Sequence, residues 1–192
     1  MKTTNPPAAK WLTATACLVG ALAASGCAST NPKDPLESFN RGVFAFNEVA
    51  DKAVIKPVAQ GYDKAVPLPG KVVVSNLFSN FTEPLVALNN LLQGKGKEAI
   101  SDIGRFLINS SVGILGAFDI ASEMGIEKHE EDFGQTFGRW GVGEGAYVVW
   151  PIIGPRTLRD TVGFFADGYV DPVWNLGDVP VRNSLVGLRF VN

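Results

Sequence analysis

Cysteine and histidine are nearly absent from this chain of 192 residues, which contains two cysteines and one histidine. So few sulfur and imidazole groups exclude a disulfide scaffold and a four-ligand zinc site. The chain also lacks a Gly-x-Ser-x-Gly motif, and a single histidine leaves little material for a serine or cysteine triad. We therefore expect a protein that is not an enzyme, with no catalytic residue, no metal and no cofactor.

The chain also has no excess of basic residues. It contains 17 lysines and arginines and 19 aspartates and glutamates, which give a formal net charge of −2. Proteins that bind DNA or RNA usually carry a basic excess that displaces counterions from phosphates, so no nucleic acid partner is expected. With 46% hydrophobic and 19% charged residues, the composition also excludes a disordered chain and fits one modest domain.

The first 26 residues have the pattern of a secretion signal. Lys2 and Lys10 precede an uncharged stretch, residues 11–25. As a helix this stretch would be about 22 Å long, shorter than the roughly 30 Å hydrocarbon core of a bilayer. We predict that residues 1–26 are a cleaved signal peptide rather than a transmembrane anchor.

Cys27 follows the small residues Ala24-Ser25-Gly26, an arrangement that resembles a bacterial lipobox. In a lipobox the thiol receives diacylglycerol and the new amine is acylated, so residues 27–33 would form a lipidated tether ahead of a domain at 34–192. Ala28, in place of the aspartate that retains lipoproteins elsewhere, favours the outer membrane, with the protein anchored on its periplasmic side. Ordinary cleavage that leaves a free cysteine is the alternative.

The mature chain is predicted to be mainly α-helical. Asp34, as an N-cap, would open a first helix, and apolar residues then recur at steps of three and four. This apolar stripe consists of Leu36, Phe39, Val43, Phe46 and Ala50. The prolines and glycine between Pro57 and Gly70 predict a turn region, and Thr82-Glu83-Pro84 predicts the start of another helix.

The stretch from Phe106 to Phe118 carries no charge. As a helix it would be about 20 Å long, too short to cross a bilayer, so it fits a buried core helix or one lying along a membrane face. Arg105 and Asp119 would then lie at its ends, in water or among headgroups. We expect the domain to embed sideways in one leaflet, and the residues expected to face the membrane are Phe44, Phe106 and Ile114.

Two neighbouring segments suggest sites at first sight. His129 to Asp132 invites a metal site, but adjacent side chains cannot all turn to one ion, so a solvated loop or first helical turn is favoured. Five glycines between residues 134 and 145 miss the G-x-G-x-x-G spacing of nucleotide-binding loops. Glycine also permits tight turns or backbone motion, so the loop is either a hinge or a static turn.

The stretch Tyr147–Pro155, which contains Trp150 and Pro151, is wholly apolar and interrupted by prolines, so it predicts an apolar hairpin loop. Polar residues follow it, among them Asp160 and Asp167. An apolar loop set against a polar helical face would form an amphipathic channel or groove.

Six ordered motifs resemble the MlaA (VacJ) family of outer-membrane lipoproteins. They are Asp34–Arg41, Lys56–Val58, Asn80–Pro84, Arg105–Ser110, Asp132–Thr136 and Gly154–Asp160. The resemblance implies a compact, ring-like helical domain in the inner leaflet of the Gram-negative outer membrane. A central amphipathic channel would return misplaced phospholipid from the outer leaflet and so maintain lipid asymmetry. The implied partners are phospholipid, a trimeric outer-membrane porin and a soluble periplasmic lipid carrier of the MlaC type.

The resemblance also assigns a lipid path. The glycine loop and the apolar hairpin match the channel-side loop of the family, and two aspartates match acidic positions that face its channel. The assigned positions are Gly141, Gly143, Gly145, Tyr147, Trp150, Pro151, Asp160 and Asp167. We expect the glycines to act as a hinge for the hairpin.

Two features leave alternatives open. Family members usually continue with further helices, whereas the helical spacing from Val181 to Val191 runs to the end of this chain. The expectation is therefore a truncated or differently ended domain.

The other function considered is a lipid-anchored scaffold of an envelope complex without a transport channel, although a pure scaffold would not need a glycine-rich loop beside an apolar hairpin.

Overall fold

A computed structural model of the chain describes residues 34–192. The predicted signal peptide, residues 1–26, and the predicted tether, residues 27–33 with Cys27, lie outside the described residues. The described part is mainly helical, as predicted. Its helices are α2 (Glu37–Ala50), the π-helical turn η1 (Asp51–Ile55), α3 (Lys56–Ala65), α4 (Leu68–Leu92), α5 (Gly96–Ser111), α6 (Ile120–Glu123), α7 (Phe133–Arg139), α8 (Leu158–Val170) and α9 (Val179–Val191).

A two-stranded antiparallel sheet completes the fold. Strand β1 (Tyr147–Trp150) pairs with β2 (Gly154–Thr157), with Tyr147 opposite Thr157 and Trp150 opposite Gly154. The hairpin predicted between Tyr147 and Pro155 is therefore confirmed. Gly154 has a φ of +92° and Ile152 one of +67°, so the turn between the strands uses two positions in the left-handed region.

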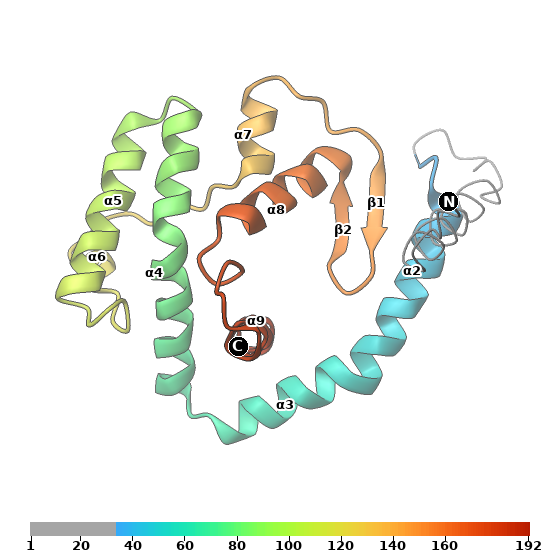
Figure 1. Cartoon of the computed structure of the whole chain (residues 1–192), viewed down its shortest axis with the longest axis horizontal. Helices are drawn as coiled ribbons and strands as arrows, with labels where there is room; N and C mark the ends of the chain where they lie inside the picture. Colours follow the sequence, from blue (N-terminus) through green and yellow to red (C-terminus); the bar gives the residue numbers. More distant parts are fainter. Residues whose placement is uncertain (1–33) are drawn as a thin grey trace, which may run out of the picture.

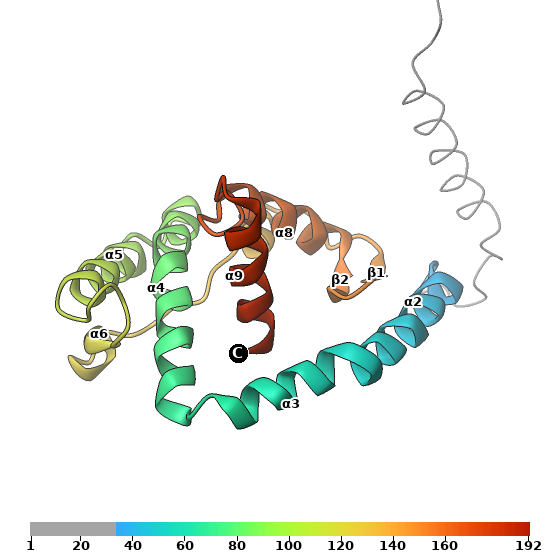
Figure 2. The ribbon, with the colours of Figure 1, turned by 60° about the horizontal axis from the view of Figure 1, so that its bottom comes forward.

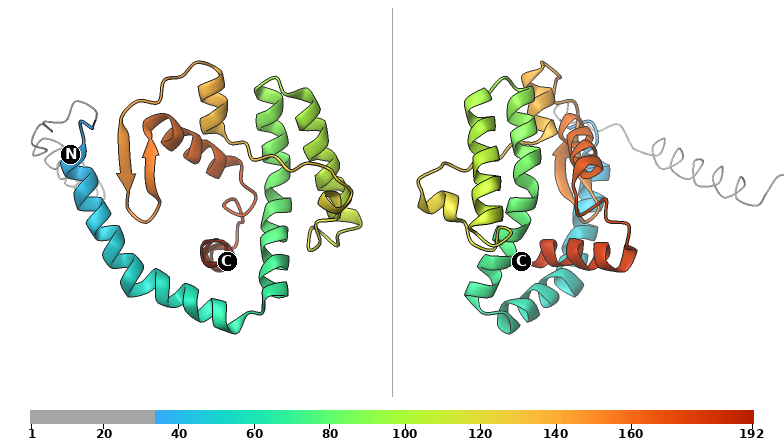
Figure 3. Two further views of the ribbon diagram at one scale, coloured as in Figure 1. Left: turned by 180° about the vertical axis from the view of Figure 1, so that it is seen from behind. Right: turned by 60° about the vertical axis from the view of Figure 1, so that its left-hand side comes forward.

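The elements form a ring (Figure 1). An arc of α2, η1 and α3 runs to the start of α4, and α5 packs along α4. The opposite side of the ring consists of α7, α8 and the hairpin, which returns to α2. Helix α9 is seen end-on inside the ring in Figure 1 and lengthwise in Figure 2, so it runs roughly along the ring axis. Figure 3 shows the same arrangement from behind and from one side.

Two asparagines of α2 close the ring. Asn40 donates to the backbone oxygen of Tyr147 at 3.1 Å and accepts from the N–H of Val149 at 2.8 Å. Seven residues later, Asn47 donates to the oxygen of Trp150 at 3.0 Å and accepts from the N–H of Ile152 at 2.8 Å. A side-chain amide has one acceptor and two donor hydrogens, so each asparagine satisfies a donor and an acceptor on the backbone of the hairpin.

The described residues distribute polarity in the opposite way to a water-soluble domain. The buried apolar residues are small: Ala87, Ala99, Ala121, Val148, Val149 and Val173. The largest fully buried side chains are polar: Arg105, Glu83, Asn89, Asn90, Thr136 and Asp102. Large apolar side chains are exposed on almost every helix. Because extensive apolar surface is unfavourable in water, this distribution fits a protein surrounded by lipid.

The apolar faces predicted to be buried are therefore mostly exposed. Phe39 and Phe46 of the predicted stripe point outward, whereas Asn40 and Asn47 face the hairpin. Phe44 is 63% exposed and Ile114 is 65% exposed, while Phe106 is half-buried. Among residues 34–192, no helix has the length and apolar character to cross a bilayer.

Several predicted boundaries differ from the structure. Helix α2 begins at Glu37, and Asp34 accepts from the N–H of Leu36 instead of capping the helix directly. The helix continues through Pro57, where η1 widens the preceding turn, and α4 continues through Pro84. A proline lacks an N–H and crowds the preceding turn, and a wider π turn relieves that crowding.

The uncharged run from Phe106 to Phe118 is not one helix. Helix α5 ends at Ser111, and three successive residues, Ile114, Leu115 and Gly116, adopt positive φ. The prediction that Arg105 lies at a helix end in water or headgroups is wrong, because Arg105 is 1% exposed inside the fold. Its charge is stabilised by partners that lie far along the chain.

Candidate functional site

A cavity of about 870 Å³ lies inside the ring. Its walls come from α4, the segment 128–132 before α7, strand β2, α8 and α9. The volume is near the upper end of the roughly 300–1,000 Å³ typical of small-molecule sites. A ligand with a long apolar part is therefore compatible with the space.

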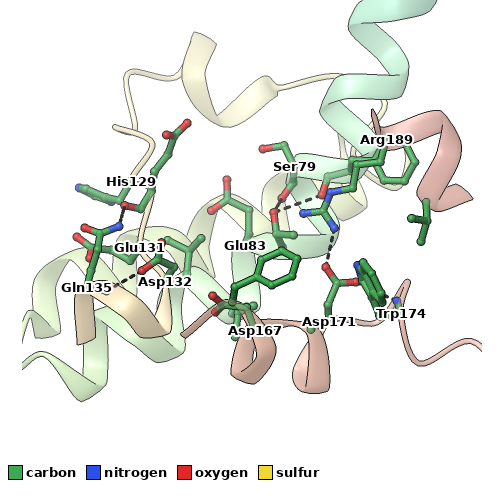
Figure 4. Close-up of a pocket in the computed structure, with 18 of the residues that line it drawn as sticks. Ser79, Glu83, His129, Glu131, Asp132, Gln135, Asp167, Asp171, Trp174 and Arg189 are labelled. Atoms are coloured by element: carbon green, nitrogen blue, oxygen red, sulfur yellow. Dashed lines mark hydrogen bonds and ion pairs between the residues drawn. The ribbon is translucent and has the colours of Figure 1, made fainter. Parts of the chain in front are cut away.

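The cavity wall combines apolar and charged side chains. The apolar members are Phe78, Leu85, Val86, Ile153, Phe164, Phe165, Trp174, Val186 and Phe190. The charged members are Glu83, Lys128, Glu130, Glu131, Asp132, Arg156, Asp167, Asp171 and Arg189, and Figure 4 labels several of them. The cavity is thus amphipathic.

A buried arginine holds the α4 side of the cavity together. Arg105 donates from all three of its nitrogens: Nε to Glu83 at 3.1 Å, Nη2 to both oxygens of Asp119 at 2.9 and 3.0 Å, and Nη1 to the Ser122 hydroxyl and the Ile126 backbone oxygen. Burial raises the pKa of Asp119, but hydrogen bonds from Ser122, Asn109 and Arg105 outweigh it and lower that pKa to about 2. The cluster joins α4, α5 and α6 through charge-assisted hydrogen bonds.

A second polar network connects α4 to α7. The Thr136 hydroxyl donates to Asn89 Oδ1 at 2.7 Å, and Gln93 Nε2 donates to Thr136 Oγ1 at 3.1 Å and to Glu131 Oε2 at 2.7 Å. Lys95 pairs with the other oxygen of Glu131 at 2.6 Å. Each member is partnered, so the network fixes the segment before α7 against the cavity.

His129 also takes part in this packing. Its Nδ1 lies 2.7 Å from Asp102 Oδ1, and Asn90 donates to the other oxygen of Asp102 at 2.7 Å. Glu130 is exposed, and Asp132 accepts from the N–H of Gln135 as the N-cap of α7. Among residues 34–192 no group of three or more histidine, cysteine or acidic side chains is placed to hold a metal ion.

Asp167 is the predicted lipid-path residue that lines the cavity. Burial raises its pKa to about 6, and the negative charges of Asp132 and Asp171 act in the same direction. The backbone N–H of Phe133, at 3.2 Å from Oδ1, and the charge of Arg156 oppose the shift. Ionised Asp167 therefore lowers the stability of the folded state.

That cost predicts a pH-dependent effect of Asp167→Asn. Because the folded pKa lies above the ordinary value, Asp167 weakens the fold as pH rises through about 6, and asparagine removes this effect. We expect the variant to be more stable by about 1–2 kcal/mol at pH 8, after allowance for partial exposure, and nearly unchanged at pH 4. Denaturant unfolding in detergent at the two pH values tests this, with exposed Glu123→Gln as the control. A variant that is equally stable or less stable at pH 8 would contradict the assignment.

The other predicted lipid-path residues lie outside the lining of the cavity. Asp160 lies in the first turn of α8, where Arg159 Nε donates to it at 3.0 Å. The remaining residues follow α7 along the glycine loop and into the hairpin: Gly141, Gly143, Gly145, Tyr147, Trp150 and Pro151. The hairpin contributes Ile153 and Arg156 to the cavity instead.

The three loop glycines differ in what their conformation requires. Gly141 and Gly145 have φ values of +90° and +70°, and a Cβ at Gly145 would lie 3.1 Å from Leu158. Gly143 lies outside the left-handed region, and a Cβ there would have no neighbour within 4 Å. In this conformation, Gly141 and Gly145 need glycine, whereas Gly143 would accept a side chain.

Sequence reasoning missed most of the polar residues that build the site. Asn40, Asn47, Asn89 and Thr136 were given no role. A signal existed in α4, where Asn80, Glu83, Ala87 and Asn90 follow helical spacing and share one buried face. This spacing would have identified the inward face of α4 if polar residues, and not only apolar ones, had been considered as candidates for burial.

Comparison with known proteins decides the family. Residues 32–192 match the family model described as MlaA lipoprotein. The chain belongs to the MlaA lipoprotein family. The family assigned from the six motifs is therefore confirmed.

Named relatives support the same assignment. A protein of Haemophilus influenzae named intermembrane phospholipid transport system lipoprotein MlaA is 36% identical over 187 residues, which are 91% of this chain and 74% of that protein. The protein of the same name in Escherichia coli K12 is 38% identical over 159 residues, 81% of this chain and 63% of that protein. An uncharacterised protein of Rickettsia typhi is 43% identical over 127 residues. That match covers 66% of this chain, which spans about half the length of the Rickettsia protein.

A solved structure has the same fold. It is described as the structural basis for maintenance of bacterial outer membrane lipid asymmetry, and it matches this chain with a TM-score of 0.73 and 34% sequence identity. The match covers 82% of this chain and 81% of that one. The ring of helices is thus an MlaA fold.

Proposed function

We propose that this chain is an outer-membrane lipoprotein that removes misplaced phospholipid from the outer leaflet and passes it through the ring to a periplasmic carrier for retrograde transport. The observation that carries the proposal is the amphipathic cavity inside a ring whose own exterior is apolar. A headgroup in bare hydrocarbon costs several kcal/mol or more, and a path with charged groups on one wall lowers that cost. The names of the relatives, which refer to intermembrane phospholipid transport, support the same function.

The exposed apolar side chains support residence within one leaflet. Phe44 and Ile114 point outward, so their apolar surface would be covered by acyl chains. A purely structural lipoprotein would have no need for a cavity with a charged wall. A porin trimer beside the ring and an MlaC-like carrier below it remain part of the proposal as partners.

Deleting the gene in the source bacterium tests the proposed function. Outer-leaflet phospholipid, measured with a membrane-impermeant amine reagent on intact cells, should rise on deletion and return to its original level when the full chain is restored. An unchanged outer leaflet in the deletion strain would contradict the proposal.

Lipidation of Cys27 would attach the mature chain permanently to the membrane. Three acyl chains, at about 0.8 kcal/mol per buried CH₂, make dissociation negligible. We expect intact-mass analysis of the mature protein to give a chain that starts at Cys27 and carries three acyl groups. A different first residue, or an unmodified thiol, would refute this assignment.

Motion of the hairpin about the glycine loop is proposed as the gate. The Gly143→Val variant is a clean test because valine has open space in the conformation described here. We expect normal folding but at least a threefold loss of phospholipid clearance, since valine restricts the other backbone conformations that a hinge visits. Clearance and thermal stability are measured together. Full clearance by a stable variant would show that the loop is a static turn.

A further inference from the structure

Two buried polar atoms of opposite kind lack partners, and both residues line the same cavity. Glu83 Oε2 is an acceptor and Arg156 Nε is a donor, and neither has a hydrogen-bond partner among the described residues. Glu83 is 2% exposed, so its free oxygen is not satisfied by bulk water. Buried groups of this kind cost folding free energy unless a ligand or an ordered water satisfies them. The pair fits a ligand that brings both a donor and an acceptor.

Arg156 is suited to the acceptor group of such a ligand. Its guanidinium carbon lies 4.5 Å from the centroid of the Phe164 ring, which fixes the side chain against the apolar wall. Arg189, the other arginine of the cavity, is already paired with Asp171 at 2.6 Å. The planar guanidinium of Arg156, which forms no ion pair in the described part of the chain, therefore remains available to a phosphate.

The carboxylates are suited to a cation. Six carboxylates line the cavity, and three of them are already paired: Glu83 with Arg105, Glu131 with Lys95 and Asp171 with Arg189. Asp132 and Asp167 accept backbone N–H groups, from Gln135 and Phe133, but have no ion-pair partner among residues 34–192. Figure 4 labels both of them, with Glu83, among the residues that line the cavity. Because Asp132 and Asp167 are unpaired, they favour a headgroup that carries a positive charge.

We propose that the cavity selects phospholipids whose headgroup carries a primary ammonium beside the phosphate, with the phosphate at Arg156 and the ammonium at Glu83 and Asp167. The inference rests on the proposed function and adds the lipid class. A quaternary ammonium has no N–H to donate to Glu83 Oε2, and a glycerol headgroup has no positive charge for the carboxylates. Phosphatidylethanolamine satisfies both atoms.

The test uses the full-length lipidated protein, purified in detergent and equilibrated with mixed micelles of defined phospholipids that share the same acyl chains. Phosphatidylethanolamine is offered at equal concentration with either phosphatidylglycerol or phosphatidylcholine, and the lipid retained by the protein is quantified by mass spectrometry. We expect retained phosphatidylethanolamine to exceed each competitor about fivefold, as one extra charge-assisted hydrogen bond gives.

Matched variants locate the selectivity. Asp167→Asn should bring the ratio over phosphatidylglycerol to within twofold of one, and Arg156→Gln should reduce retention of all three lipids. The exposed residues Glu123 and Arg139 lie outside the cavity, so Glu123→Gln and Arg139→Gln should leave the wild-type ratio unchanged.

Each outcome has a distinct meaning. Equal retention of the competing lipids by the wild type, or an unchanged ratio in Asp167→Asn, would overturn the headgroup inference while leaving phospholipid transport intact. Retention of no phospholipid at all by the wild type would overturn both. The wild-type ratio decides the matter even if a variant fails to fold.

Discussion

Replacing Arg105 by glutamine is expected to remove about 3–5 kcal/mol from the free energy of unfolding, the largest stability effect of any single change considered. The guanidinium is 1% exposed and forms five hydrogen bonds. Its loss leaves Glu83 buried with two unpaired oxygens and removes the positive charge that Asp119 faces. Breaking a buried ion pair costs more than the pair contributes, because the remaining charge has no water to solvate it.

Denaturant unfolding of the detergent-solubilised protein measures this effect. Arg105→Lys keeps the charge but lacks the planar fork that reaches both carboxylates, so it should recover only part of the stability. Arg139→Gln, an exposed arginine at the end of α7, should change the free energy of unfolding by less than about 0.5 kcal/mol. A loss of under 1 kcal/mol for Arg105→Gln would show that the cluster contributes little to the fold.

The helical content could be predicted from the sequence, but the direction in which the helices face could not. Apolar periodicity marked α2 correctly as an amphipathic helix, yet Phe39 and Phe46 are exposed and Asn40 and Asn47 face inward. The rule that the apolar face of an amphipathic helix packs against the core assumes that water surrounds the fold. When lipid surrounds it, apolar side chains lose nothing by facing outward, and backbone and side-chain polar groups are paired inside.

The prolines led to wrong predicted helix ends, because packing between helices outweighs their local effect. Pro84 lies inside α4, where the packing of α5 along its length stabilises the helix beyond the missing hydrogen bond. Local sequence carries no information on that packing. Conversely, Gly94, with a φ of +79°, follows the C-terminus of α4, where a left-handed residue is often required, and this requirement can be recognised from the local sequence.

The sequence predicted those parts of the site that depend on a single residue or one local segment, but not the pairs of residues that are distant along the chain. Asp167 was assigned to the polar wall and lines the cavity, and the apolar hairpin exists where it was expected. The pairs His129 with Asp102 and Thr136 with Asn89 join residues 27 and 47 positions apart. Such pairs depend on how the chain returns to α4 and α5, which single-residue patterns do not encode.

Filling the cavity should have the largest effect on function. Ser75 and Ser79 lie one turn apart on α4 and both line the cavity. Tryptophan at both positions would occupy much of the space beside α4, so we expect the Ser75→Trp/Ser79→Trp variant to retain less than about 10% of phospholipid clearance if lipid must pass through. The matched control is Ser38→Trp/Gly42→Trp on α2, where both residues are exposed and face away from the hairpin.

The amount of phospholipid in the outer leaflet of intact cells tests the central claim most directly. It is measured in a deletion strain restored with the wild-type chain, with the filled-cavity variant or with the α2 control, after equal amounts of each are confirmed in the outer membrane. We predict that the wild type and the control lower outer-leaflet phospholipid to the level of the parent strain, whereas the filled-cavity variant leaves it as high as in the deletion. Normal clearance by the filled-cavity variant would contradict passage of lipid through the ring.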